Sequence, residues 1–239
     1  MNAFNDSTAL VTGANKGIGK EIARQLAAAG LRVYVGARDP ERGRRAVEEI
    51  GGGARLLVLD VTDDKSVAAA SAEVPDLDVL VNNAGIMLDG TSAPGTDLGA
   101  LRRTYDTNLF GVFAVTDAFL PALRRSPRPR IVNVSSGTGS LGWSTGPDAR
   151  FPTGTGIAYR SSKAALNMLT VCYAHALAPE GFKVNALAPG LRRTDLAPRA
   201  AASDGDPAEA AAGAVRLALL PEDGPSGAFL SWDGTPVPW

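Results

Sequence analysis

The chain has 239 residues, with 24 Lys and Arg against 25 Asp and Glu, for a formal net charge of −1 at pH 7. This balance provides no cationic surface for nucleic acid, and one cysteine excludes an intrachain disulfide. There is neither a signal-like N-terminus nor an apolar stretch of about 18 residues, so we expect no membrane contact and a cytoplasmic location.

Apolar, β-branched runs alternate with segments of helical spacing. The runs predict strands at residues 8–12, 31–37, 55–60, 79–81, 130–135, 183–188 and 227–231. The helical segments are 17–29, 40–50, 64–72, 97–125, 157–178 and 206–219. Alternation of this kind indicates an α/β fold, in which a doubly wound parallel sheet of about seven strands has helices on both faces.

Two segments interrupt the alternation. Residues 137–156 are rich in Gly, Ser, Thr and Pro, which is typical of a long irregular loop, and residues 197–207 are rich in Ala, Pro, Ser and Asp. Long loops in compact α/β domains are commonly functional or mobile. Because the alternation resumes after each of them, we predict one domain over residues 1–239.

A glycine-rich turn, TGANKGIG, joins the first predicted strand to the first predicted helix at residues 12–19. Glycines permit a tight turn there and let backbone N–H groups approach a pyrophosphate, which the helix N-terminus also attracts. An ordinary βα turn is the alternative. The position of the turn in the first βαβ unit favours a dinucleotide site.

Tyr159 and Lys163 are one helical turn apart in the segment 157–178, so their side chains share a face. A phenol exchanges protons poorly at neutral pH. A neighbouring ammonium lowers its pKa and suits it to general acid–base catalysis. Taken alone, such a pair is more often an ordinary surface pair.

Further motifs follow in order. They are NNAG at 82–85, Asn108, IVNVSS at 131–136, YRSSK at 159–163 and Pro189–Gly190. Together with TGxxxGxG at the first turn, they resemble the short-chain dehydrogenase/reductase family over essentially the whole chain. The long step from Ser136 to Tyr159 resembles its carbonyl-reductase-like branch. The resemblance implies a single Rossmann-type domain, with 137–156 as an inserted active-site loop and 191–220 as a mobile substrate-side segment.

The resemblance also implies the catalytic residues, namely Asn108, Ser136, Tyr159 and Lys163. Tyr159 would be the general acid/base, Lys163 would also bind the nicotinamide ribose, and Ser136 would orient the substrate carbonyl. Adjacent residues at a strand end face opposite ways, so Ser135 is the alternative to Ser136. Asn108 would hold a proton-carrying water, or would instead be a helix amide that bonds backbone.

The cofactor expected from the resemblance is NADP(H). Its binding residues would be Gly13, Asn15, Lys16, Gly17, Ile18, Gly19, Arg38, Asp60, Val61, Asn83, Ala84, Gly85, Tyr159, Lys163, Pro189, Gly190, Leu191 and Thr194. Asp60 and Val61 would frame the adenine. The alternative is that Asp60 is an acid at the N-terminus of helix 64–72, although Asp63 or Asp64 could fill that role instead.

The second predicted strand ends without the carboxylate that would bind the ribose 2′-hydroxyl of NAD. Arg38 and Lys16 lie, by the resemblance, beside the 2′ position, where cations suit a phosphate. Asp39 should point elsewhere. The alternative is that both cations are solvated surface residues.

Arg192 departs from the family, in which a branched apolar residue is usual. It could bind a phosphate or an anionic substrate, but we expect its side chain to turn outward. The expected substrate pocket is apolar and lined by Met87, Leu141, Trp143, Phe151 and Leu191. It would admit a hydrophobic ketone or aldehyde. Alternatively, the inserted loop packs on its own aromatic residues.

These expectations describe a reversible, NADPH-dependent reductase of a small carbonyl compound. A β-ketoacyl-carrier-protein reductase is the enzymatic rival, and a non-catalytic NADP(H)-binding sensor is the rival from another class. No Cys, His or carboxylate cluster has metal-ligand spacing, so no metal is expected. The sequence leaves the choice between monomer and homo-oligomer open.

Overall fold

The fold is built on a seven-stranded parallel sheet with the strand order β3-β2-β1-β4-β5-β6-β7. The computed structural model describes residues 7–88 and 95–239. The strands are β1 (Thr8–Thr12), β2 (Arg32–Ala37), β3 (Ala54–Val58), β4 (Val79–Asn82), β5 (Arg130–Val134), β6 (Lys183–Ala188) and β7 (Phe229–Ser231). The prediction of an α/β fold with one parallel sheet is therefore confirmed, and the strand order reverses direction between β1 and β4.

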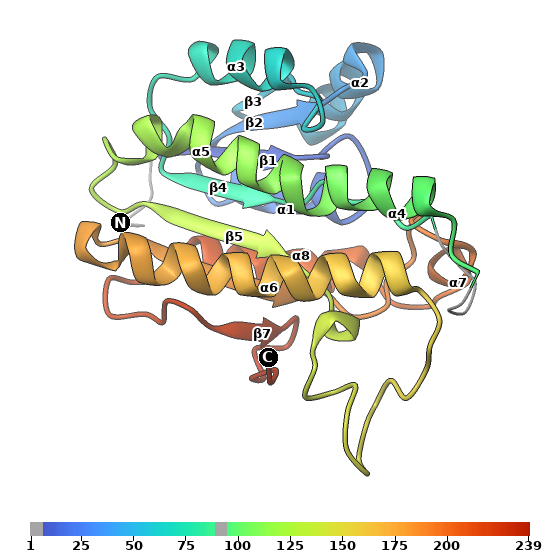
Figure 1. Cartoon of the computed structure of the whole chain (residues 1–239). Helices are drawn as coiled ribbons and strands as arrows, with labels where there is room; N and C mark the ends of the chain where they lie inside the picture. Colours follow the sequence, from blue (N-terminus) through green and yellow to red (C-terminus); the bar gives the residue numbers. More distant parts are fainter. Residues whose placement is uncertain (1–6, 89–94) are drawn as a thin grey trace.

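Helices cover both faces of this sheet (Figure 1). One layer contains α1 (Gly17–Ala28), α2 (Pro40–Ile50) and α8 (Pro207–Ala218). The other contains α3 (Asp64–Glu73), α4 (Leu98–Tyr105), α5 (Gly111–Leu123) and α6 (Ile157–Leu177). Because both sheet faces are covered, the central strands β1, β4 and β5 are buried along their whole length.

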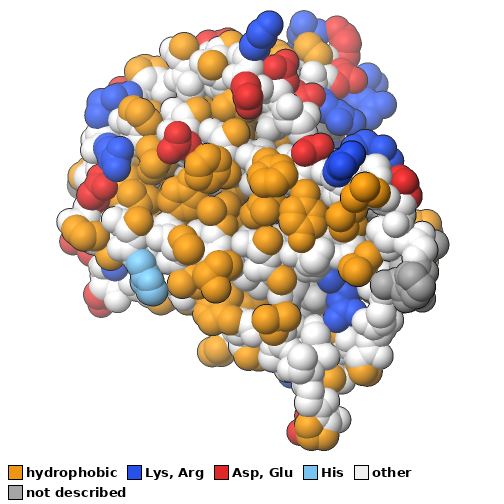
Figure 2. All heavy atoms as spheres, in the orientation of Figure 1, with side chains coloured by type: hydrophobic (Ala, Val, Ile, Leu, Met, Phe, Trp, Pro, Cys, Tyr) orange, Lys and Arg blue, Asp and Glu red, His pale blue; other side chains and the backbone are white. Residues whose placement is uncertain are grey.

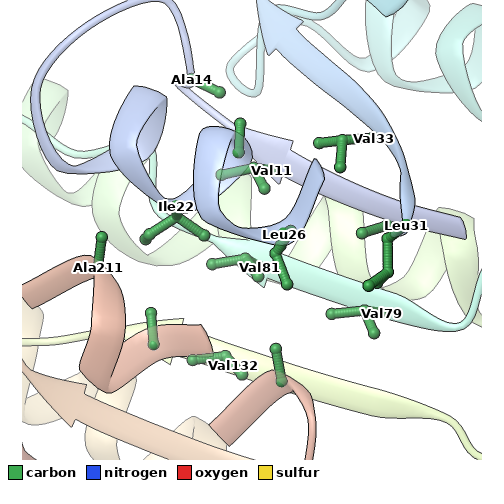
Figure 3. Packing of buried hydrophobic residues seen from close by; sticks show 14 of the residues in the cluster. Val11, Ala14, Ile22, Leu26, Leu31, Val33, Val79, Val81, Val132 and Ala211 are labelled. Atoms are coloured by element: carbon green, nitrogen blue, oxygen red, sulfur yellow. The ribbon is translucent and has the colours of Figure 1, made fainter. Parts of the chain in front are cut away.

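Each layer buries its own apolar cluster against the sheet. Figure 3 shows one of them, where Ile22 and Leu26 of α1 pack on Val11, Val81 and neighbouring strand residues. The opposite cluster joins α3, α5 and α6 to the sheet through residues such as Phe119. These clusters hold the carboxyl ends of the strands in fixed positions, which is where the loops described below begin.

The segment 97–125 is not the single regular helix that the sequence predicts. A π-helical turn, Asp106–Phe110, separates α4 from α5. Gly111 follows it, and a Cβ at this position would lie 2.8 Å from the carbonyl oxygen of Val61. The helix therefore comes into close contact with the end of the β3–α3 connection, and the wider turn turns Asn108 inward, where it is fully buried.

The segment after β5 leaves the body of the molecule. A short 3-10 turn, Gly137–Gly139, is followed by an irregular stretch that projects beyond α6 before the chain returns to that helix (Figure 1). The end of the chain lies against the base of this stretch. The amide of Gly142 donates to the carbonyl of Trp239 at 2.9 Å, and Trp239 stacks on Phe229 of β7 with ring centroids 5.2 Å apart.

The helical face over α4, α5 and α6 carries exposed apolar side chains, among them Phe110, Phe113 and Met168 (Figure 2). No helix within residues 7–88 and 95–239 is long and apolar enough to cross a membrane. The segment 191–220 contains the short helix α7 (Pro198–Ala201) and most of α8.

Candidate active site

A cavity of about 420 Å³ lies at the carboxyl ends of the strands, above the point where the strand order reverses. Sixteen of the eighteen expected cofactor residues line it, as do Tyr159 and Lys163 among the expected catalytic residues. Gly190 and Leu191 do not line it. The cavity thus brings together residues from the first turn, from the segment after β4, from α6 and from the segment after β6.

At Gly19 the glycine turn is packed too tightly for a side chain. A Cβ on Gly19 would lie 2.3 Å from Nδ2 of Asn83 and 2.6 Å from the carbonyl oxygen of Gly13. Gly13 itself has φ of +62°, a backbone conformation that favours glycine. The hydroxyl of Thr12 accepts bonds from the amides of Asn83 and Ala84, both at 3.0 Å. The backbone around the turn is therefore fixed and open toward the cavity, as a pyrophosphate cradle requires.

The end of the cavity near β2 carries several cations together with Asp39, which also lines the cavity and pairs with Arg42 at 3.4 Å. Arg38 and Lys16 line it as expected, and Arg42 of α2 lies there too. Arg42 was not among the expected residues; it lies in the first turn of α2, and a basic residue so close to the end of β2 is the signal that could have identified it. The carboxylate of Asp39 caps α2 by accepting from the amides of Glu41 and Arg42, so it is directed at the helix.

Two acids follow β3 and have different partners. Asp60 lines the cavity and accepts bonds from the amide and hydroxyl of Thr62 at 3.0 and 2.8 Å. Asp63 caps α3 by accepting from the amide of Lys65. Helix capping therefore belongs to Asp63, and Asp60 remains beside Val61 at the cavity wall.

Tyr159, Ser136 and Lys163 converge at the other end. The hydroxyl of Ser136 hydrogen-bonds with Tyr159. The Lys163 ammonium lies 5.8 Å from the centre of the Tyr159 ring and donates to the carbonyl of Val134 at 2.8 Å. Lys163 is nearly fully buried. A phenol and an amine therefore line one end of the cavity. Ser136 and Asn108 do not line it, but the Ser136 hydroxyl lies beside the phenol.

The electrostatics of this pair differ from the sequence expectation that Lys163 lowers the pKa of Tyr159. Burial raises the pKa of the Tyr159 hydroxyl, and the hydrogen bond with Ser136 acts in the opposite direction. Burial also lowers the pKa of Lys163 to about 8. The reason is that both groups have lost water, which disfavours the charged form of each.

The two adjacent serines have separate environments. The hydroxyl of Ser135 borders the cavity but is bonded to the side chain of Asn167 on α6, and it also approaches the carbonyl of Lys163 at 3.4 Å. The hydroxyl of Ser136 instead faces Tyr159 and contacts the Thr138 hydroxyl at 2.9 Å. Ser136 is thus the serine whose hydroxyl is beside the phenol.

The side-chain amide of Asn108 is fully engaged with protein groups. Its Oδ1 accepts from the amide of Ile86, and its Nδ2 donates to the carbonyl of Ile86, both at 2.9 Å. Nδ2 also lies 3.1 Å from the hydroxyl of Ser162. This geometry corresponds to the backbone-bonding alternative, because Asn108 ties the segment after β4 to α6 next to Lys163.

The expectation for Arg192 is wrong. Its side chain is only 8% exposed, and the guanidinium lies 4.2 Å from the Trp232 ring centre. Its Nη1 pairs with Glu209 at 3.3 Å. Arg192 turns inward because Gly190 and Gly205 leave room beside it and an aromatic face accepts a cation. It joins the segment after β6 to α8 and to the chain after β7.

The expected apolar pocket forms only in part. Met87 lines the cavity, whereas Leu141, Trp143, Phe151 and Leu191 do not. Leu141 and Leu191 are exposed, and Trp143 pairs with Phe151 at a ring-centre distance of 6.2 Å. The loop therefore packs on its own aromatic residues, which is the alternative considered from the sequence.

No group of three or more His, Cys, Asp or Glu that could hold a metal ion occurs in the part of the chain that the structure describes. The residues that line the cavity suit an anionic, extended organic cofactor instead. Glycine backbone and a helix N-terminus face its middle, and cations face one end.

Comparison with known proteins gives consistent matches. The family model described as short chain dehydrogenase matches residues 7–204. Salutaridine reductase from Papaver bracteatum is 34% identical, over 92% of this chain and 93% of that protein. The 3-oxoacyl-(acyl-carrier-protein) reductase of Escherichia coli (strain K12) is 34% identical, over 81% of this chain and 76% of that protein.

Among solved structures, the NADPH-bound carbonyl reductase from chicken fatty liver superposes with a TM-score of 0.86. It is 31% identical, and the match covers 98% of this chain and 100% of that one.

Proposed function

The chain belongs to the short chain dehydrogenase family, and from that premise we propose that it is an NADPH-dependent reductase of ketones or aldehydes. Membership makes it an oxidoreductase that interconverts CH–OH and C=O groups. The observation that carries the proposal is the placement of Tyr159, bonded to Ser136 and close to Lys163, at the end of the cavity opposite the cations.

The cofactor would lie along the cavity. The backbone of Gly13, Gly17 and Gly19 would receive the pyrophosphate, and Asp60 and Val61 would flank the adenine. Arg38 and Lys16 would bind a 2′-phosphate, because both cations line that end, where the Asp39 carboxylate is engaged in capping α2. When bound, NADPH supplies the hydride.

The protein groups would manage the substrate oxygen and its proton. Tyr159 would donate a proton to the oxygen of the carbonyl as it becomes an alkoxide, and Ser136 would hold that oxygen by a hydrogen bond. Lys163, with its pKa lowered to about 8 by burial, is suited to exchanging a proton near neutral pH. Asn108 would act as a positioning residue that keeps residues 83–86 beside Lys163. In the reverse direction the same groups would oxidise an alcohol.

Reduction of a β-ketoacyl group on a carrier protein is a second candidate, supported by the similarity to the E. coli enzyme. A non-catalytic sensor is less well supported, because this chain has both Tyr159 and Lys163 at the cavity.

The decisive experiment follows NADPH absorbance across ketones, quinones, aldehydes and acyl thioesters. We expect the wild type to turn over free apolar ketones or aldehydes, with a strong preference for NADPH over NADH at matched low concentrations. The variant Tyr159→Phe should show no turnover. That variant should still bind NADPH, which fluorescence titration checks. Comparable rates with both cofactors would refute the NADP(H) assignment. A carrier-bound ketoacyl chain turned over far faster than any free ketone would favour the second candidate. NADPH binding without any turnover would favour the sensor.

A further inference from the structure

The guanidinium of Arg160, the residue directly after Tyr159, makes four hydrogen bonds. Nε donates to the carbonyl of Thr138 at 3.2 Å, and Nη1 donates to the carbonyl of Thr153. Nη2 donates to the hydroxyl of Ser144 at 2.9 Å and to the carbonyl of Phe151 at 3.1 Å. All four acceptors lie in the segment 137–156.

These acceptors lie on both sides of the projecting loop, which we define as residues 140–155. Ser144 is in its outgoing part, and Phe151 and Thr153 are in its returning part. Within the loop, the amides of Arg150 and Phe151 both donate to the carbonyl of Trp143. Arg150 also stacks on the Trp143 ring, 4.2 Å from its centre. Arg160 is thus a residue of α6 to which both parts of the projecting loop are attached.

The same side chain is linked to Ser136 through Thr138. Thr138, which accepts from Nε, contacts the hydroxyl of Ser136 at 2.9 Å. A Cβ on Gly137, next to Ser136, would meet the ring of Trp143 at 2.7 Å. At the other end of the segment, a Cβ on Gly156 would lie 3.7 Å from the terminal carbon of Met87, which lines the cavity. The projecting loop therefore begins and ends beside groups that would face the substrate.

From this arrangement we propose that Arg160 is a positioning residue, which fixes the projecting loop at the substrate entrance and thereby sets which carbonyl compounds are reduced. The inference rests on the proposed reductase function for its substrate, but the attachment of the loop does not. Arginine suits the role because one planar group presents five donors in a fixed fork. Lysine could satisfy only part of this set of acceptors.

The first experiment tests attachment alone, by limited trypsin digestion of the cofactor-free protein. The loop contains an exposed cleavage site after Arg150, where native backbone bonds to Trp143 hinder access to the protease. We expect Arg160→Met to raise the rate of cleavage after Arg150 about fivefold or more, and Arg160→Lys to raise it less. Ser144→Ala, which keeps Arg160 but removes one acceptor, should give a small increase.

The matched control is Arg124→Met. Arg124 makes two bonds to Glu180, at 2.7 and 3.0 Å, away from the loop, and cleavage after Arg150 should then equal that of the wild type. A wild-type cleavage rate in Arg160→Met would overturn the inference. An equal increase in the Arg124 variant would also overturn it, since general destabilisation would then explain the result.

The second experiment compares the bulkiest and the smallest carbonyl compounds that the wild type reduces. For Arg160→Met we expect KM for the bulky compound to rise about tenfold, with a much smaller change for the small one and an unchanged pH profile of kcat. Partial recovery in Arg160→Lys supports positioning. An equal loss of kcat for both compounds would overturn the proposal, because Arg160 would then act on the position of Tyr159 rather than on that of the loop. Failure of the reductase proposal can be distinguished from failure of this inference, because in that case the wild type itself would oxidise no NADPH.

Discussion

At the scale of single residues, the adjacent Ser135 and Ser136 offer the sharpest contrast, because only Ser136 meets Tyr159. Ser136→Ala should lower kcat about a hundredfold or more, since it removes a bond to the reacting oxygen. Ser135→Ala should leave turnover close to wild type but lower the free energy of unfolding by about 1–3 kcal/mol, because Asn167 loses a buried partner. Steady-state kinetics and chemical denaturation measure the two effects. The reverse pattern would assign the catalytic hydroxyl to Ser135.

Lys163 makes stability depend on pH. Folding lowers its pKa from 10.5 to about 8, so between these values the unfolded chain retains a proton that the folded chain has lost. Stability contributed by this group therefore rises with pH across the window, and below pH 8 the full cost of burying the ammonium applies. Relative to Lys163→Met, the free energy of unfolding of the cofactor-free wild type should increase by roughly 3 kcal/mol across the window. Denaturation of both proteins at several pH values checks this, and parallel curves would contradict it.

Most cavity-lining residues could be predicted from the sequence, because their positions require a particular residue type. Gly19 has no room for a side chain, and Tyr159 lies one helical turn before Lys163. The sequence did not predict the direction of Arg192. That direction depends on Trp232 and Glu209, which reach it only through tertiary packing. It also missed the effect of burial on the pKa of Tyr159, because solvent exclusion is a property of the folded cavity.

At the scale of elements, the π-helical turn between α4 and α5 shows what periodicity cannot predict. The apolar pattern of 97–125 continues through the turn, so it indicates one helix. The extra residue in the turn is required by contacts outside the helix, namely Gly111 against Val61 and Asn108 against Ile86. The strands, by contrast, were predicted within a few residues because their runs are buried on both sides.

Gly111→Ala tests the contact behind this turn. The new methyl group would lie 2.8 Å from the Val61 carbonyl oxygen and 2.9 Å from its Cγ2 atom, so the free energy of unfolding should fall by about 1–3 kcal/mol. Gly99→Ala in α4 is the control, since its neighbours are the ends of the Asp97 and Arg103 side chains. It should change stability by less than about 1 kcal/mol. Equal losses in a denaturant titration would show that the Val61 contact does not require glycine.

At the scale of the whole molecule, an ion pair spans the cavity. Lys16 of the first turn and Asp195, after the sixth strand, lie 2.6 Å apart, with both side chains more than half exposed. Lys16 holds the pKa of the Asp195 carboxyl below its usual value, so Asp195 is charged at neutral pH. A 2′-phosphate near Lys16 would have to compete with this carboxylate.

Asp195→Asn should therefore tighten NADPH binding about three- to fivefold and leave NADH binding unchanged, an effect of the size expected for an exposed pair. Asp204→Asn, an exposed acid of the same segment that does not line the cavity, is the control. Equilibrium titrations at low and moderate salt measure both. Equal tightening for NADH would mean that Asp195 acts on the diphosphate rather than on the 2′ position.

The contact between Trp239 and Gly142 has a consequence for the order in which the protein matures. A chain emerging from the ribosome acquires its glycine turn early and the helix α6 midway, after the central strands β1, β4 and β5. The residues that support the base of the projecting loop are synthesised after these segments. A nascent chain that has completed β6 thus carries the glycine turn, Tyr159 and Lys163, whereas the cavity-lining residues after Ala188 and the residues that contact the base of the projecting loop have still to follow.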